Sequence, residues 1–140
     1  MDDATFLQRF ETQAWPLAEW HHREHIKLAY LYLRALPFDA AVTKARANIQ
    51  AFNAAHQIPE AIDRGYHETM TLAWMCLVHC TLCEFGPSDG ADAFVDKHPQ
   101  LLSKRALLFF YSRDRIMSAE AKATFIEPDL APLPRTKKPG

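Results

Sequence analysis

The chain has 140 residues, of which 49% are hydrophobic and 24% are charged, so it is long enough for one globular core and too short for two. Its formal net charge of -1 excludes a large basic surface. The basic side chains that do cluster, Arg135, Lys137 and Lys138, lie near the C-terminus. Composition therefore predicts a single domain and argues against a nucleic-acid partner.

Apolar residues recur at helical spacing along most of the chain, and no stretch alternates strictly between apolar and polar residues as a half-buried strand would. The pattern predicts an all-α protein, a helical bundle of about four main helices followed by short C-terminal helices. The first helix is predicted over residues 3–14. The second is predicted over residues 16–36, because Pro16 suits a first helical turn and Pro37 stops a helix.

The third predicted helix covers residues 39–55, with Asp39 as its N-cap. The fourth helix is long and apolar, and it is predicted to end at residue 85 because Gly86 and Pro87 follow. Shorter helices, the last of them capped by Ser118, are predicted over residues 91–97, 100–111 and 119–126. The fourth helix is expected to be the most buried element.

These helices are predicted to form one domain over residues 1–126, followed by a proline-rich tail over residues 127–140 that lies extended on the surface or is disordered. The acidic N-terminus lacks the positive start and apolar run of a secretory signal. The longest stretch without a charged residue, residues 69–83, is shorter than a membrane span. We therefore expect a cytoplasmic protein with no membrane partner, and the sequence leaves its oligomeric state open.

Two histidine clusters lie where the predicted helices carry core residues. On the second helix, His22 and His25 share one face with Ala29 and Tyr32, and His67 begins an inward stripe in the first turn of the fourth helix. Burial favours neutral imidazole, which is the form that binds metal. If the two helices pack together, the three histidines form an open site for a divalent transition metal such as Zn, Fe, Ni or Cu.

Glu68 follows His67 directly, and it is predicted to orient a ligand or to move a proton as the acid/base residue of the site. Arg113 or Arg115 is suited to hold an anionic group. Four side chains are predicted to contact a small-molecule ligand: Tyr66, Thr71, Trp74 and Arg113. An open site of this kind suits metal-assisted hydrolysis or oxygen chemistry, and the sequence does not decide whether the protein is an enzyme.

Other interpretations of the histidines stay open. They are also compatible with a metal-free module that binds a small molecule or a protein, and with purely structural core histidines hydrogen-bonded to their neighbours. Residues 21–25 match the H-x-x-E-H pattern of inverzincin metalloproteases, although the chain is shorter than a typical domain of that class. Binding under chelation separates the metal-free module from a metal site.

A second group of soft ligands follows helical spacing on the fourth helix, and it comprises Cys76, His79, Cys80 and Cys83. These side chains are suitable ligands for copper or zinc. One helix cannot easily wrap four ligands around one ion, and free cysteine is a common core residue, so core packing is the preferred interpretation. Three cysteines without a secretory signal also argue against a disulfide framework.

Three segments of the chain carry a resemblance: Trp20-His21-His22-Arg23-Glu24-His25-Ile26, Phe52-Asn53-Ala54-Ala55-His56 and Gly65-Tyr66-His67-Glu68-Thr69. In these segments, and onward through Trp74 to Tyr111-Ser112 and residues 127–130, the chain resembles a bacterial family of small uncharacterised helical proteins with W-x-H-x-x-H and G-Y-H-E-T motifs. The resemblance implies a site at His22, His25 and His67, and it implies no particular reaction.

Overall fold

A computed structural model describes residues 1–134, and in this part of the chain helices and loops form the whole fold without a β-strand, as predicted. The α-helices are α1 (Asp3–Glu11), α2 (His22–Ala35), α3 (Phe38–Ala55), α4 (Glu68–Phe85), α5 (Ala91–Lys97), α6 (Arg113–Ile116) and α7 (Ala119–Ala123). The 3-10 helices are η1 (Leu17–Glu19), η2 (Pro99–Leu102) and η3 (Lys104–Phe109).

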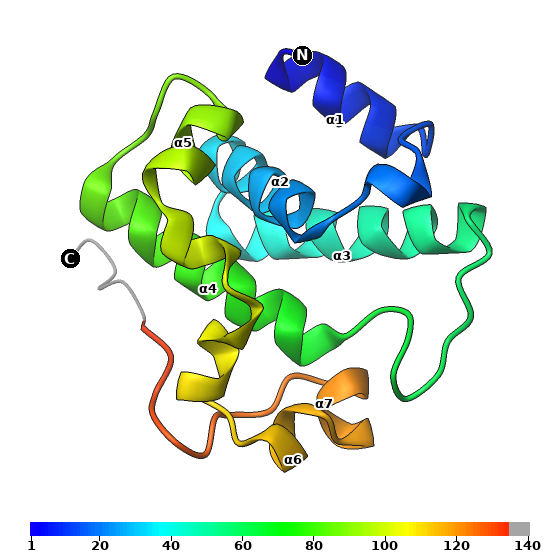
Figure 1. The fold of residues 1–140 in the computed structure, drawn as a ribbon, viewed down its shortest axis with the longest axis vertical. Helices are drawn as coiled ribbons and strands as arrows, with labels where there is room; N and C mark the ends of the chain where they lie inside the picture. Colours follow the sequence, from blue (N-terminus) through cyan, green and yellow to red (C-terminus); the bar gives the residue numbers. More distant parts are fainter. Residues whose placement is uncertain (135–140) are drawn as a thin grey trace.

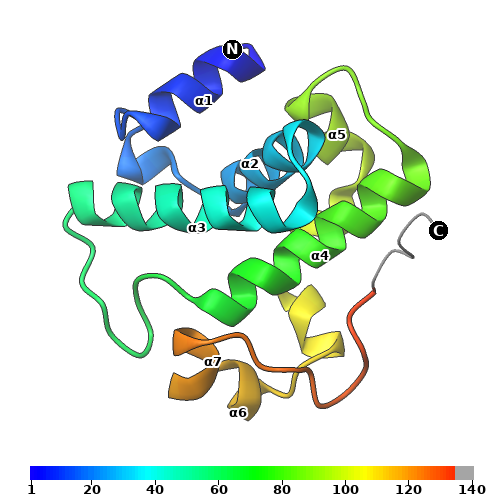
Figure 2. The same ribbon diagram turned by 180° about the vertical axis from the view of Figure 1, so that it is seen from behind.

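Helix α4 divides the molecule, with α1, α2, α3 and α5 on one side and the α6–α7 segment on the other (Figures 1 and 2). Helix α2 contacts α3, α4 and α5, and α4 contacts α3 and α7. The segment from η2 to η3 crosses α4 and connects the two sides (Figure 1). Residues distant in sequence therefore meet around the N-terminal half of α4.

The buried side chains form two clusters, one on each side of α4. The larger cluster joins α1, α2, α3 and α5, and it includes Phe6, Phe10 and Phe52. The smaller cluster joins α4 to the C-terminal segment and is made of Ala73, Leu107, Tyr111, Ile116, Ala121, Ile126 and Leu133. Trp74 and Leu77 pack against both clusters, so α4 supplies a wall to each.

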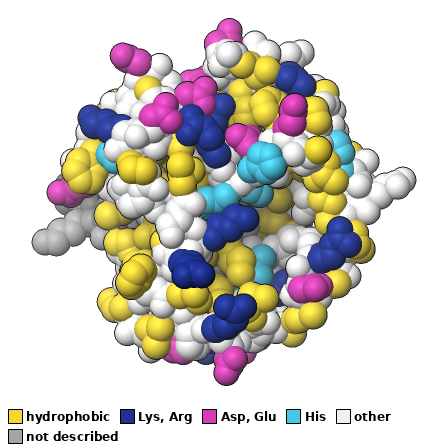
Figure 3. All heavy atoms as spheres, in the orientation of Figure 1, with side chains coloured by type: hydrophobic (Ala, Val, Ile, Leu, Met, Phe, Trp, Pro, Cys, Tyr) yellow, Lys and Arg dark blue, Asp and Glu magenta, His cyan; other side chains and the backbone are white. Residues whose placement is uncertain are grey.

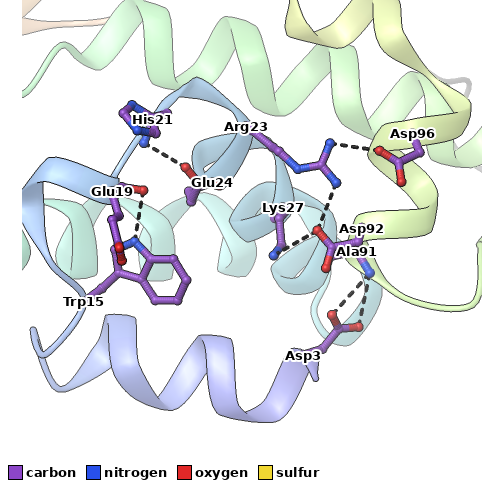
Figure 4. Close-up of polar contacts among 10 residues, drawn as sticks. All are labelled: Asp3, Trp15, Glu19, His21, Arg23, Glu24, Lys27, Ala91, Asp92 and Asp96. Carbon is purple, nitrogen blue, oxygen red and sulfur yellow. Dashed lines mark hydrogen bonds and ion pairs between the residues drawn. The ribbon is translucent and has the colours of Figure 1, made fainter. Parts of the chain in front are cut away.

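The predicted second helix over residues 16–36 is wrong in its first part. Pro16 leads into the short 3-10 turn η1, Trp20 is extended, and α2 begins only at His22. The Glu24 carboxylate accepts a hydrogen bond from the His21 backbone N–H at 2.9 Å and so satisfies a donor that precedes the helix (Figure 4). This local cap starts a new helix where the apolar periodicity alone predicts a continuous one.

Three other predicted helix ends shift for local reasons. α1 ends at Glu11 rather than at residue 14, because Gln13 has a positive φ of 62°. Pro37, and not Asp39, occupies the N-cap position of α3. His67 is the N-cap of α4 rather than a residue of its first turn. The predicted end of α4 is confirmed, but the expectation that this helix is the most buried element is wrong, because α2 has more buried residues.

The C-terminal part differs most from the prediction. The predicted helix over residues 100–111 is instead the two 3-10 segments η2 and η3, and α6 was not predicted. The helix predicted over residues 119–126 ends at Ala123, although its predicted cap is confirmed, since the Ser118 side chain accepts from the Ala121 N–H. The helix predicted over residues 91–97 is confirmed with the same bounds.

The first part of the predicted tail packs onto the domain. Leu133 is 5% exposed and belongs to the smaller cluster, and the Leu130 N–H donates to the Phe110 carbonyl. The remainder of the predicted tail, residues 135–140 with its basic side chains, lies outside the described residues. Within residues 1–134, no helix combines the length and apolar character that crossing a membrane requires.

Candidate functional site

A pocket of about 860 Å³ lies between α2, α4 and the segment from η3 to α6. It brings together the three predicted metal ligands and the four predicted ligand-binding residues: His22, His25, His67, Tyr66, Thr71, Trp74 and Arg113. Figure 3 shows the same face as Figure 1, where histidine, lysine and arginine side chains gather around a hollow at the centre. The remaining predicted site residue, Glu68, does not line the pocket.

His67 is held at both ring nitrogens. Its Nδ1 accepts a hydrogen bond from the Met70 backbone N–H at 3.0 Å, which caps the N-terminus of α4. Its Nε2 lies 2.8 Å from the Ile116 carbonyl oxygen, so that nitrogen carries the proton and donates. In this arrangement His67 ties α4 to α6 and has no free lone pair for a metal.

His22 is held at one ring nitrogen. Its Nε2 donates to the Leu101 carbonyl at 2.9 Å, which leaves the Nδ1 atom with the lone pair. The imidazole also lies edge-on to Trp74, with ring centroids 4.5 Å apart. His22 therefore connects α2 to η2 and α4 while one nitrogen keeps the capacity to accept a hydrogen bond or bind a metal.

His25 has the opposite tautomer. Its Nε2 accepts from the Trp20 indole N–H at 2.9 Å, so the neutral ring carries its proton on Nδ1. Trp20 is in turn stacked on Phe10, with ring centroids 4.4 Å apart. Core packing of the indole thus fixes both the position and the tautomer of His25.

Burial keeps the three imidazoles neutral near pH 7. It lowers the pKa of His25 to about 4, and repulsion from His22, when that ring is protonated, and from Lys104 acts in the same direction. Burial also lowers the pKa of His22 and of His67, and the hydrogen bonds to the Leu101 and Ile116 carbonyls only partly oppose it. The site therefore presents uncharged imidazole, as the sequence pattern predicts.

Glu68 serves a different part of the structure. Its carboxylate receives two hydrogen bonds from the Arg46 guanidinium, at 2.9 and 2.7 Å, and one from the Tyr66 hydroxyl at 2.6 Å. Burial alone would raise the pKa of Glu68, but the hydrogen bonds from Arg46 and Tyr66 outweigh it and hold the pKa below its usual range. This ionised carboxylate joins α3 to α4, and its acid/base role stays a prediction.

Three cations surround the mouth of the pocket: Lys104, Arg105 and Arg113. All three side chains are exposed, and within residues 1–134 none forms an ion pair or a side-chain hydrogen bond. No aspartate or glutamate lines the pocket. Only Arg113 was predicted, because the position of Lys104 and Arg105 at the pocket depends on how the η3 segment packs over α4, a tertiary contact that the local sequence does not encode.

A fourth cation, Arg23, lines the pocket but is already paired. Its guanidinium donates to Asp92 and to Asp96 of α5, both at 2.9 Å, and Lys27 also reaches Asp92 at 3.2 Å (Figure 4). The Asp3 carboxylate accepts from the Ala91 N–H at the start of the same helix. This network holds α2 against α5, so that His22 and His25 keep their place at the pocket.

Among the described residues, no group of three or more His, Cys, Asp or Glu side chains is arranged to hold a metal ion. On α4, the Cys83 Sγ lies 3.6 Å from the His79 Nε2, and Cys83 is exposed while Cys76 and Cys80 are partly buried. The Glu24 of the H-x-x-E-H pattern accepts from the His21 N–H and caps α2. Metal binding by His22, His25 and His67 stays a prediction.

Comparison of the chain with models of protein families, with curated proteins and with solved structures finds no match. The functional conclusion therefore depends on the pocket and on the side chains that line it.

Proposed function

We propose that this protein binds a small organic anion with an apolar body in the pocket between α2, α4 and the η3–α6 segment. The observation that supports it most is the charge of the lining: three unpaired cations, Lys104, Arg105 and Arg113, and no carboxylate. Most of the remaining lining is aliphatic or aromatic. Small-molecule sites have this composition, with a few polar groups that orient a largely apolar ligand.

The neutral histidines add directional hydrogen bonds without adding charge. His22 keeps an acceptor at Nδ1, whereas His25 keeps a donor at its own Nδ1. A ligand that carries a hydroxyl or carbonyl group beside its apolar body would pair with these atoms. The negative charge of the ligand would lie among the cations, because uncharged imidazole does not offset that charge.

The test uses anilinonaphthalene sulfonate, an aromatic anion, as a probe in isothermal titration calorimetry. We expect one site per chain and about a tenfold weaker affinity in Arg113→Gln, which corresponds to the loss of one charged contact of about 1.4 kcal/mol. The control is Lys97→Gln on α5, another exposed cation that does not line the pocket. An equal loss in both variants, or no binding by the wild type, would contradict the proposal.

A metal-dependent activity on a small molecule is the second candidate. It is supported by the presence of His22, His25 and His67 in one pocket and by their neutral state. To bind a metal, His67 would have to give up its bond to Met70 or to Ile116. Chelation distinguishes the two candidates, because the anion site keeps its affinity in EDTA.

Elemental analysis tests the metal site directly. Wild type, His67→Ala and His21→Ala are purified without chelators or tags and compared at equal concentration. The metal candidate requires about one transition-metal ion per chain in the wild type and in His21→Ala, and its loss in His67→Ala. Absence of metal from the wild type would reject this candidate.

A further inference from the structure

Polarity is graded along the pocket. The three cations at its mouth are exposed, whereas the aliphatic side chains at its other end are buried and come from α2, α3 and α4: Leu28, Ala29, Ala45, Ile49 and Met75. None of these five is more than 8% exposed. We infer that the ligand is an anionic amphiphile with one unbranched alkyl chain, with its headgroup at the cations and its chain directed toward α3. This inference rests on the proposed function and narrows its ligand to one chemical class.

The size of the pocket favours a chain over a compact anion. Its volume of about 860 Å³ lies in the upper part of the range of roughly 300–1,000 Å³ typical of small-molecule sites. A carboxylate or phosphate group at the mouth would leave most of this volume unfilled. An apolar cavity filled by a matching apolar group gains both the transfer free energy and the dispersion contacts of each methylene.

Two features of the lining suit a flexible aliphatic chain rather than a rigid ring system. Methionines line the pocket from its buried end to its mouth, and their unbranched side chains adapt to irregular shapes: Met70, Met75 and Met117. Three apolar side chains of the lining are exposed, as the cations are: Leu17, Leu108 and Met117, at 42%, 37% and 42%. These side chains would cover the first methylenes below the headgroup.

The histidines fix the direction in which such a ligand enters. Each of the three rings is held by one hydrogen bond to a neighbouring element, and burial favours its neutral form. The pairs are His22 with the Leu101 carbonyl, His25 with the Trp20 indole and His67 with the Ile116 carbonyl. The neutral rings therefore do not balance the negative charge of an anion placed deeper in the pocket. The cations that can balance this charge all lie at the exposed end of the pocket: Lys104, Arg105 and Arg113.

The experiment is a chain-length series of butanoate, octanoate and dodecanoate, each kept below its critical micelle concentration. Binding is followed by the fluorescence of Trp20 and Trp74, which line the pocket, and stoichiometry by calorimetry. We expect one ligand per chain and about fourfold tighter binding for each added methylene that enters the pocket. Arg113→Gln should weaken dodecanoate about tenfold, whereas Lys97→Gln should not.

A second variant tests where the chain lies. Ala45→Met adds volume at the buried end, so it should weaken dodecanoate and leave butanoate unchanged. If this variant does not fold, judged by its far-ultraviolet circular dichroism, the same question is put to the wild type with hexadecanoate, whose gain over dodecanoate should cease once the pocket is filled.

The failures of the inference and of the proposed function can be told apart. If butanoate and anilinonaphthalene sulfonate bind but affinity does not rise with chain length, the alkyl chain is rejected and the anion site is retained. If dodecanol binds as tightly as dodecanoate, the role of the cations at the headgroup is rejected. If no anion binds at all, both the inference and the proposed function are rejected.

Discussion

Each of the three pocket histidines is fixed by a hydrogen bond that joins two elements of the fold. His22 binds the Leu101 carbonyl of η2, His25 accepts from the indole that precedes α2, and His67 caps α4 while donating to the Ile116 carbonyl of α6. A buried polar side chain without such a partner would cost folding free energy. The same bonds that stabilise the fold thus determine which nitrogen of each ring carries the proton.

The first prediction for a single residue concerns the pH dependence of stability. His25 titrates near pH 6.5 when unfolded and at about 4 when folded, so the unfolded chain binds more protons in between. The contribution of neutral His25 to the free energy of unfolding is present above pH 6.5 and is lost as the pH falls toward 4. The loss amounts to about 2 kcal/mol at pH 5. Urea unfolding at pH 7 and pH 5 should show this loss in the wild type and a smaller loss in His25→Gln, whose amide oxygen still accepts from Trp20.

The control for this prediction is His21→Gln, because His21 is exposed. Its unfolding free energy should decrease between pH 7 and pH 5 as much as that of the wild type. Equal decreases in His25→Gln and the wild type would show that His25 does not cause the pH dependence. Burial also lowers the pKa values of His22 and His67, so part of the decrease should remain in His25→Gln.

A second residue-scale prediction concerns Glu68. Glu68→Gln removes the charge that pairs with Arg46, and the free energy of unfolding should fall by about 2 kcal/mol, as for other hydrogen bonds to charged groups. The matched control, Glu120→Gln on α7, replaces an exposed carboxylate and should change stability by less than about 0.5 kcal/mol.

The Glu68→Gln variant also distinguishes a structural role of Glu68 from a role in the pocket. Because Glu68 does not line the pocket, Glu68→Gln should bind anilinonaphthalene sulfonate with wild-type affinity at a temperature where it is folded. A change of more than about threefold in its dissociation constant would show that the carboxylate acts on the ligand.

At the scale of elements, helical periodicity predicts which segments are helical better than where each helix starts. The segment before α2 has the right spacing of apolar residues, but Trp20 is extended and Glu24 caps a new helix start at His21. Residues 100–111 also show helical periodicity, yet they form two 3-10 segments that follow the surface of α4. Capping and tertiary contacts decide both outcomes.

The contact between α2 and α5 gives a prediction at this scale. Lys27 is buried, lies over the Phe6 ring at 4.4 Å and pairs with Asp92, so Asp92→Asn leaves an ammonium group without its carboxylate. We expect a loss of about 2–3 kcal/mol in the free energy of unfolding, at the lower end for a buried pair because Asp92 itself is half exposed.

Asp96→Asn is the matched control, since it removes the other partner of Arg23 on the same helix. The Asp96 carboxylate is 68% exposed, and exposed ion pairs contribute only about 0–1 kcal/mol. Thermal unfolding of the two variants should therefore differ clearly. Equal losses would mean that burial of Lys27 does not govern the contact between the helices.

At the scale of the whole molecule, two cores meet at α4 and the pocket lies where they meet. Its lining takes Leu28 and Ile49 from the side of the larger core, and Leu107 and Ile116 from the smaller one. Trp74 contacts both cores and also lines the pocket. The smaller core thus positions the cations of η3 and α6 over the N-terminal half of α4.

This arrangement gives a prediction for the C-terminal segment. Leu133→Ala opens a cavity in the smaller core and should lower the free energy of unfolding by about 2–4 kcal/mol. Leu130→Ala, at a leucine that is 58% exposed, is the control and should cost less than about 1 kcal/mol. Chemical denaturation measures both, and equal effects would contradict the packing of residues 127–134 on the domain.

The sequence by itself determined the helical class, the end of α4 and the histidines that line the pocket. These follow from periodicity and from local signals such as Gly86, which act over a few residues. Only the tertiary structure decided the partners of His67 and Glu68, and the placement of Lys104 and Arg105 at the pocket mouth. Those contacts join residues far apart in the chain, and no local pattern encodes them.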